Sequence, residues 1–278
     1  RRGYAGLLEE DIVDMDTMSV SDIVQKGGTI LYTSRCPEMV TPEGQKKAAD
    51  ICRKHGIDGI VVIGGDGSFR GAQKLSANGI NTIGVPGTID LDISCTEYTA
   101  CNTAMEAIDK VRDTSASHER CSIIEVMGRT AGHIALWCGI SNGSEYITIP
   151  ERYDNDEQKI IEKIRAKRRI GKKHHIIVNA EGVGNSYQMA KDIEEATGIE
   201  TRATVIGHIQ RGGNPSCRDR VYASSMGAMA VDLLIAGKTN RVVAYRSGKF
   251  CDFDIEEALA MTKDIDEHLY SLTMRLSR

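Results

Sequence analysis

Glycines surround a single carboxylate in the stretch IGGDGS, residues 63–68, which follows an apolar run and precedes a helical pattern. Glycine lets a bulky anion approach the backbone, and the first turn of a helix offers N–H groups that bind phosphate. Asp66 would repel a phosphate unless a cation lies between them, so the stretch indicates a polyphosphate site at which Asp66 serves Mg²⁺. A plain turn with Asp66 as a helix cap accounts for these residues equally well.

Two further carboxylates, Asp90 and Asp92, follow the next apolar run, in PGTIDLD at residues 86–92. If Asp66 serves a metal ion, one of the two could accept the proton of an alcohol that attacks a phosphoryl group. A surface turn rich in aspartate is the alternative, and these residues taken alone favour it.

Basic side chains stand close to several expected strand ends: Arg120, Arg129, Arg202, His208 and Arg211. A guanidinium group suits bidentate recognition of phosphate. One such residue usually forms a surface ion pair, but several on one rim are better explained by a phosphorylated acceptor. The residues therefore predict Mg²⁺-dependent phosphoryl transfer to a phosphorylated alcohol, without identifying the alcohol.

These residues must be positioned by alternating strands and helices. Apolar, β-branched runs predict strands at 29–33, 59–63, 81–85, 121–127, 145–149, 174–180, 202–207 and 240–245. The alternation is typical of an α/β fold with two doubly wound, mostly parallel sheets. Ligands bind beyond the carboxyl ends of such strands, so the five glycine-containing loops at these ends are expected to line one cleft.

Composition excludes several other classes of protein. The chain has 278 residues and a net charge of −4, with three Phe and one Trp, which argues against nucleic-acid binding. The eight cysteines form neither a C-x-x-C pair nor a zinc pattern, so we expect a reducing, cytoplasmic location. No apolar run is long enough to span a membrane, and the basic run 163–175 is interpreted as a solvated helix face.

Five longer motifs carry a family resemblance: IGGDGS, GVPGTIDLD, DTSASHER, IIEVMGRTAG and ETRATVIGHIQRGGNPS. In this order and spacing they resemble the 6-phosphofructokinases, from Gly3 to the end of the chain. NAD and lipid kinases share a GGDG-like loop but do not explain HIQRGG. The resemblance implies two similar α/β lobes with the active site between them, usually in a homotetramer. Residues 1–99 and 211–260 would form the ATP-binding lobe, and residues 100–210 and 261–278 the sugar-phosphate lobe.

The resemblance also implies the reaction and its residues. The γ-phosphoryl group of ATP would pass to the 1-hydroxyl of fructose 6-phosphate, giving fructose 1,6-bisphosphate. Asp90 would be the general base, flanked by Thr88 and Asp92, with Arg129 steadying the transferring group and Asp66 serving Mg²⁺. The positions that match ATP contacts are Tyr4, Arg35, Cys36, Gly64, Gly65, Gly67, Ser68 and Gly71. Those that match sugar-phosphate contacts are Met127, Gly128, Arg129, Glu181, His208 and Arg211, joined by Arg120 and Arg202 from a neighbouring subunit.

Gly67 and Gly87 match ATP-dependent members of the family, where pyrophosphate-dependent members tend to carry Asp and Lys. A pyrophosphate-dependent relative and a non-catalytic regulatory paralogue are the alternatives. The chain departs from the family by having Leu91 between its aspartates, by lacking an opening strand with a GGDAPG loop, and by lacking a few residues near 96–105.

Regulation by ADP or phosphoenolpyruvate is expected to be weakened. Four positions match the family's effector site: Asp22, Arg112, Glu145 and Lys172. Two of the family's basic positions there are Thr17 and Ile170 in this chain, and an anion site that loses two cations should bind its effector more weakly.

Overall fold

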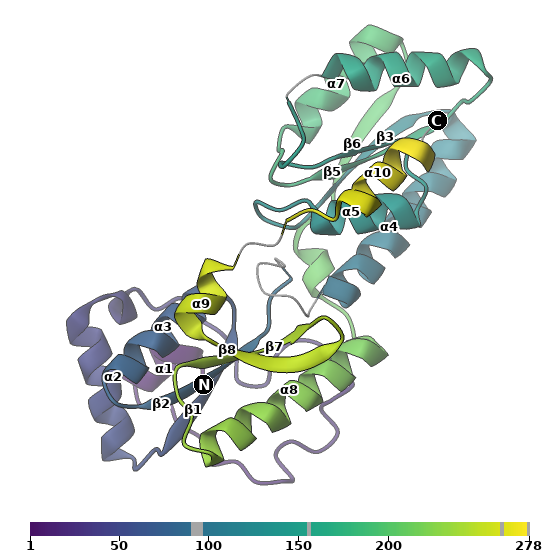
Figure 1. Ribbon diagram of the computed structural model, residues 1–278. Helices are drawn as coiled ribbons and strands as arrows, with labels where there is room; N and C mark the ends of the chain where they lie inside the picture. Colours follow the sequence, from purple (N-terminus) through teal and green to yellow (C-terminus); the bar gives the residue numbers. More distant parts are fainter. Residues whose placement is uncertain (90–96, 155–156, 262–263, 277–278) are drawn as a thin grey trace. The chain divides into compact units, whose positions relative to one another are not determined.

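The computed structural model describes residues 1–89, 97–154, 157–261 and 264–276 (Figure 1). These residues fall into two compact units. Unit 1 consists of residues 1–88 and 213–261, and unit 2 of residues 89, 97–154, 157–212 and 264–276. The chain passes from one unit to the other near residues 89–97, 212 and 262. The lobe boundaries predicted from the sequence lie at 99, 210 and 260.

Unit 1 is built on a four-stranded sheet with the order β1-β2-β7-β8. The first three strands are parallel, and β8 pairs antiparallel with β7. The strands are β1 (Gly59–Gly64), β2 (Asn81–Pro86), β7 (Arg241–Arg246) and β8 (Lys249–Asp254). The helices are α1 (Gly3–Leu8), α2 (Pro42–Lys54), α3 (Asp66–Ala77), α8 (Cys217–Ile235) and α9 (Ile255–Ala260), with a 3₁₀ helix, η1 (Pro37–Val40).

Helices cover both faces of the unit 1 sheet because successive strand residues point to opposite sides. Ile60 and Val62 of β1 pack with residues of α2, α3 and α9, whereas Val61 between them packs with residues of α8. Buried hydrophobic clusters therefore lie on both faces, which confirms the predicted doubly wound arrangement.

Unit 2 contains a second four-stranded sheet, with the order β4-β5-β3-β6 and all strands parallel. The strands are β3 (Cys121–Val126), β4 (Tyr146–Thr148), β5 (His175–Ala180) and β6 (Thr201–Val205). The helices are α4 (Glu97–His118), α5 (His133–Ser141), α6 (Glu157–Arg169), α7 (Ser186–Thr197) and α10 (Glu267–Leu276), with a 3₁₀ helix, η2 (Gly207–Arg211).

The core of unit 2 also alternates between two faces. Ile176 and Val178 of β5 pack with residues of α4 and α5, whereas Ile177 packs with residues of α6 and α7. These two pairs of helices cover opposite faces of the sheet in Figure 1. Every residue of β5 is buried, as expected for a central strand covered by helices on both sides.

Local signals in the sequence explain where elements begin. The side chain of Thr41 accepts a hydrogen bond from the Gly44 N–H at 3.1 Å, and Pro42 occupies the first turn of α2. Ser216 caps α8 in the same way and forms a reciprocal capping box with Asp219. Such caps satisfy the N–H groups that a helix start leaves unpaired.

The strand predictions were wrong at one segment and missed one strand. Residues 29–33, predicted as a strand, do not form one: residues 30–31 form a turn, and Ile30, Leu31 and Tyr32 are exposed. A strand needs a ladder partner and a buried face, and this segment has neither among the described residues. Strand β8 was missed, although Ser247 and Gly248 both adopt positive φ, at 50° and 81°, and form the two-residue hairpin turn before it.

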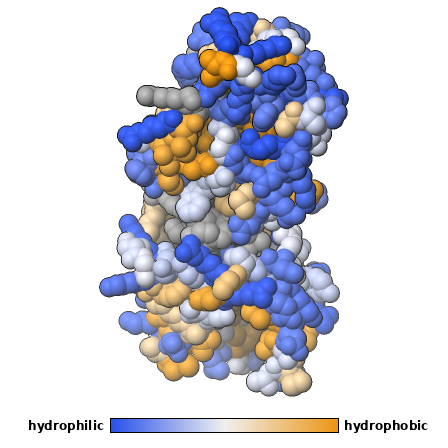
Figure 2. Space-filling model, turned by 90° about the vertical axis from the view of Figure 1, so that its right-hand side faces the viewer, coloured by the Kyte–Doolittle hydropathy of each residue, from blue (hydrophilic) through white to orange (hydrophobic). Residues whose placement is uncertain are grey.

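On the face in view in Figure 2, hydrophilic residues cover most of the surface and smaller hydrophobic patches lie among them. Within the described ranges, no helix combines the length and the apolar character needed to cross a membrane.

His175 should make stability depend on pH. Its side chain is fully buried on β5, and neither ring nitrogen has a hydrogen-bond partner among the described residues. Burial lowers the pKa of His175 below the ordinary 6.5, which outweighs the opposing effect of Glu145. The unfolded chain therefore binds more protons than the folded chain below that pH, and the free energy of unfolding should fall as the pH drops below 6.5.

Denaturant unfolding between about pH 8 and about pH 5 measures this effect. His175→Gln should flatten the decline below pH 6.5. The matched control His118→Gln, at an exposed position of α4, should keep it. An unchanged slope in His175→Gln would contradict the assignment.

Candidate functional site

The glycine loop of unit 1 connects β1 to α3. Gly65 is extended and caps α3, which begins at Asp66. A Cβ atom on Gly64 would lie 2.3 Å from the Ser68 Oγ, so only glycine fits there without a shift. At Gly67, by contrast, a Cβ atom would meet nothing within 4 Å. The loop is thus tightly packed at its first glycine and open at its last, with the N-terminus of a 12-residue helix behind it.

The end of β2 lies against this loop. Gly64 pairs with Pro86 in the parallel ladder, and the Gly87 N–H donates to the Gly64 carbonyl at 2.7 Å. The side chain of Thr88 lies 3.4 Å from the point where a Cβ atom of Gly65 would stand. The two loops that carry the predicted acidic residues therefore start side by side.

The predicted general base Asp90, its neighbour Leu91 and Asp92 lie outside the described residues. The structure places the segment that leads into them, up to Ile89, and no further. Their roles stay predictions.

Tyr4 supports the glycine loop from within the fold. Its hydroxyl donates to the Ser68 carbonyl at 2.6 Å, and its ring lies where a Cβ atom of Gly71 would come within 2.5 Å. Burial raises the pKa of Tyr4 well above its ordinary value, so the phenol stays protonated and remains a donor. Of the other residues predicted around the nucleotide, Arg35 is exposed and Cys36 packs against the cluster around α2.

In unit 2, a turn at Met127–Arg129 follows β3 and is held by two side chains. The Met127 N–H donates to Gln210 Oε1 at 2.7 Å, and Glu181 Oε1 accepts from the Gly128 N–H at 3.3 Å and from the Arg129 N–H. Arg129 has a left-handed φ of 57°, which is strained for a residue with a Cβ. These hydrogen bonds therefore stabilise the turn with Arg129 in its left-handed conformation.

Sequence reasoning assigned no role to Gln210, which is only 1% exposed. The signal was available, because Gln210 is the glutamine of the HIQRGG motif. His208 and Arg211 belong to the same 3₁₀ helix, η2, and are exposed. Since β3, β5 and β6 are parallel, the residues that follow them meet at the carboxyl edge of the sheet. The structure thus places Met127, Gly128, Arg129, Glu181, His208 and Arg211 along that edge.

Arg120 and Arg202 lie at the opposite, amino edge of this sheet. Both pair with Glu200, through Arg120 Nε at 2.7 Å and Arg202 Nε at 2.9 Å. Hydrogen bonds from Arg120 and then Arg202 lower the pKa of the Glu200 carboxyl. Arg120 precedes β3 whereas Met127 follows it, and a six-residue strand spans about 20 Å. One chain therefore does not bring these two arginines to the turn at Met127.

Three of the predicted regulatory positions lie in unit 2. Glu145 is 5% exposed, forms an ion pair with Lys172, and accepts the Ile176 N–H at 2.5 Å. Arg112 donates to the Asn142 carbonyl, three residues before Glu145. Asp22 belongs to unit 1, where it is exposed and has a left-handed φ of 54°.

No group of three or more His, Cys, Asp or Glu side chains that could hold a metal ion occurs within the described ranges. Asp66 is the carboxylate that the glycine loop itself supplies. A single carboxylate suits Mg²⁺, which commonly takes one or two from the protein and further oxygens from substrate phosphates and water.

Comparison with known proteins gives a consistent result. A family model described as Phosphofructokinase matches residues 1–234. The chain is 54% identical over 283 residues to an ATP-dependent 6-phosphofructokinase of Clostridium botulinum (strain Hall), covering 100% of this chain and 88% of that protein. It is 53% identical over 284 residues to one of Clostridium acetobutylicum, with the same coverage.

Among solved structures, phosphofructokinase from Saccharomyces cerevisiae superposes with a TM-score of 0.85 at 28% identity. The match covers 99% of this chain and 42% of the yeast chain, so this chain spans about two fifths of that relative.

Glu181→Ala should loosen the turn at Met127–Arg129, because two backbone N–H groups would lose their acceptor. Hydrogen exchange should speed up at Gly128 and Arg129. Glu181→Gln should restore most of the protection, since an amide oxygen still accepts. Glu195→Ala, at an exposed position of α7, is the matched control and should change neither amide. Equal exchange in Glu181→Ala and the unaltered protein would show that the turn holds itself.

Proposed function

The chain belongs to the phosphofructokinase family, and we propose that it transfers the γ-phosphoryl group of ATP to the 1-hydroxyl of fructose 6-phosphate, giving fructose 1,6-bisphosphate. Relatives named ATP-dependent 6-phosphofructokinase align with its whole length. The observation that carries the proposal is the glycine loop at the start of α3, which is open at Gly67 and lies against the end of β2. The loop would receive the donor's phosphates, and the segment after β2 would act on the acceptor.

Residues of unit 1 would bind the nucleotide. The N-terminus of α3 suits phosphate oxygens, and the missing Cβ at Gly67 leaves room beside it. Asp66 would hold Mg²⁺ together with those phosphates. When bound, the ion supplies neutralisation of the charge that develops on the phosphoryl oxygens.

Residues of unit 2 would bind the acceptor. The turn at Met127–Arg129 presents backbone in a fixed conformation, and Arg129 on it would stabilise the equatorial oxygens of the transferring group. The side chains of His208 and Arg211 would face the 6-phosphate. Asp90 would take the proton of the 1-hydroxyl onto a carboxylate oxygen, with Thr88 and Asp92 beside it.

Arg120 and Arg202 would reach the 6-phosphate of a neighbouring subunit in a homotetramer. Their place at the amino edge of the sheet, about a strand length from the turn in their own chain, supports a role in another subunit's site. Their shared partner Glu200 holds the two guanidinium groups together, which would present them as one cationic unit.

Regulation by ADP would be weak. Lys172, one of the cations available to an effector at this position, is engaged by the buried Glu145, so an anion would compete with that carboxylate. A cytoplasmic location is supported by the seven described cysteines, all of which are free thiols.

Asp90→Asn should separate chemistry from binding. The amide keeps the shape of the side chain but cannot take the proton, so kcat with ATP and fructose 6-phosphate should fall by about 10²–10⁴-fold in a coupled assay. Calorimetry should still detect binding of fructose 6-phosphate. Asp58→Asn, an exposed aspartate just before β1, is the control and should keep kcat within about twofold. Full activity of Asp90→Asn would exclude Asp90 as the base, and activity with pyrophosphate alone would exclude ATP as the donor.

Gly67→Asp should reduce kcat/KM for ATP by on the order of a hundredfold, because a second carboxylate would repel the phosphates. A side chain at this position meets nothing within 4 Å, so the free energy of unfolding should barely change. Gly67→Ala is the matched control for size and should lose less than about tenfold. If Gly67→Asp keeps its kcat/KM for ATP, the loop does not bind the nucleotide.

A further inference from the structure

A polar row of three side chains crosses the carboxyl end of the unit 2 sheet, in strands that are rich in apolar residues. Thr148 of β4 pairs in the ladder with Asn179 of β5, which pairs with Glu125 of β3. Thr148 and Asn179 are fully buried, and Glu125 is half-buried. Because a polar side chain loses its water when it is buried, each member of the polar row needs a partner inside the protein.

A chain of hydrogen bonds runs along the polar row in one direction. The Thr148 hydroxyl donates to Asn179 Oδ1, and the Asn179 amide nitrogen donates to Ser186 Oγ at 2.7 Å. The Ser186 hydroxyl in turn donates to Glu125 Oε2 at 2.5 Å. Ser186 is the first residue of α7, so the Glu125 carboxylate lies at the helix end whose dipole favours a negative charge. None of the four side chains leaves a buried nitrogen or oxygen without a partner among the described residues.

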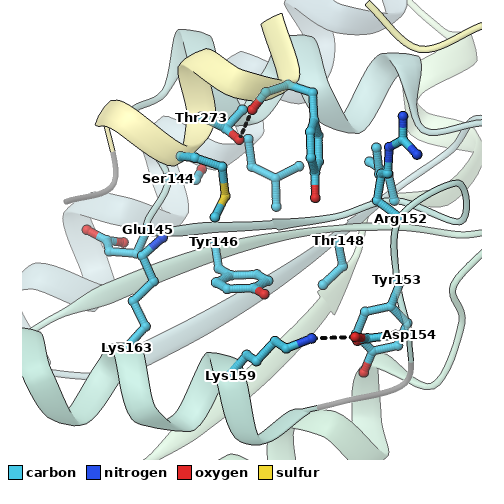
Figure 3. A pocket seen from close by; sticks show the side chains of 14 residues that line it. Ser144, Glu145, Tyr146, Thr148, Arg152, Tyr153, Asp154, Lys159, Lys163 and Thr273 are labelled. Carbon is cyan, nitrogen blue, oxygen red and sulfur yellow. Dashed lines mark hydrogen bonds and ion pairs between the residues drawn. The ribbon is translucent and has the colours of Figure 1, made fainter. Parts of the chain in front are cut away.

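One end of this network reaches a pocket. Of the four residues, Thr148 alone lines the pocket of about 280 Å³ over β4 (Figure 3). Its hydroxyl donates to the Asn179 amide oxygen, which leaves the amide nitrogen facing Ser186 and Gly184. The network therefore bonds to itself and to the backbone, and its role lies in what it holds in place.

Packing alone does not explain the polar row, because replacing both partners of a buried hydrogen bond by apolar groups of the same shape is often nearly neutral for stability. The network does, however, bind the loop at residues 181–185, which joins β5 to α7. Asn179 Nδ2 donates to the Gly184 carbonyl at 3.0 Å. Gly184 and Asn185 both have a left-handed φ, at 71° and 56°, so this end of the loop is held in a specific conformation.

The other end of the 181–185 loop lies against the turn at Met127–Arg129. Glu181 Oε1 accepts the N–H groups of Gly128 and Arg129. A Cβ atom on Gly182 would lie 2.6 Å from the Arg129 carbonyl oxygen, so the loop backbone packs directly on the turn backbone. Both contacts reach the backbone of the turn, and a displacement of the loop would therefore displace Arg129.

We propose that Ser186, Asn179 and Glu125 are positioning residues for phosphoryl transfer: they fix the 181–185 loop, and the loop fixes the turn from which Arg129 acts. The effect on the reaction rests on the proposed function, whereas the effect on the turn does not. The two effects are measured separately.

Ser186→Ala removes one hydroxyl and interrupts the network between Asn179 and Glu125. Hydrogen exchange at the amides of Gly128 and Arg129 should become at least about tenfold faster, because the loop that holds them is loosened. With ATP and fructose 6-phosphate, kcat should fall by at least about tenfold, since a small displacement of a catalytic group is costly. The KM for ATP, which unit 1 would bind, should stay within about twofold.

Ser115→Ala is the matched control, because it removes a hydroxyl that is equally well buried and hydrogen-bonded. Ser115 of α4 is 2% exposed, as Ser186 is, and its Oγ lies 2.5 Å from that of Ser122, near the start of β3. Denaturant unfolding should show a comparable loss of stability in Ser115→Ala and Ser186→Ala. Ser115→Ala should nevertheless keep kcat and the exchange of Gly128 and Arg129 within about twofold.

Glu125 provides a second route to the same network at a half-buried position. Glu125→Leu removes the final acceptor and should reproduce the effects of Ser186→Ala, and combining the two should add little, because both break one network. Glu125→Gln keeps an oxygen that accepts from Ser186 and should restore exchange and kcat to within about threefold.

Two results would overturn the proposal. One is exchange at Gly128 and Arg129 that is no faster in Ser186→Ala and Glu125→Leu than in Ser115→Ala. The other is an unchanged kcat in these two variants of an active protein. If the unaltered protein does not phosphorylate fructose 6-phosphate, the proposed function fails, and the exchange rates still decide whether the polar row positions the turn.

Discussion

Registration between parallel strands is the constraint on which the rest of this structure depends. In unit 2, β3 pairs residue by residue with β5 and β6, so the chain leaves all three strands at one edge. Only for that reason can Glu181, after β5, and Gln210, after β6, both reach the backbone of the turn after β3. A slip of one residue would turn Ile177 to the wrong face and also withdraw these acceptors, so core packing and site geometry are fixed together.

The two edges of the unit 2 sheet have different chemistry. At the carboxyl edge, side chains hold backbone N–H groups and leave Arg129, His208 and Arg211 exposed. At the amino edge, charged side chains pair with one another, as Glu200 does with two arginines and Glu145 with Lys172. The carboxyl edge therefore leaves these three side chains open to solvent, whereas the amino edge holds its charges in ion pairs.

Much of the fold was predictable because burial on both faces leaves a strong pattern: seven of the eight predicted strands occur. Residues 29–33 have the same apolar pattern, but pattern alone does not reveal whether a partner strand is available. For the candidate site, the sequence motifs predicted which loops follow the strands and therefore lie at one edge of a sheet. The hydrogen bonds from the turn to Gln210 and Glu181 could not be predicted, because each joins residues more than fifty positions apart.

The contact of the Tyr4 ring with Gly71 links two positions that lie far apart in the sequence. The ring occupies the space that any larger residue at 71 would need, and its hydroxyl bonds the loop carbonyl at Ser68. A substitution at one position therefore requires a substitution at the other: a homologue with alanine at position 71 would need a smaller side chain at position 4. Such a pair is expected to covary among homologues.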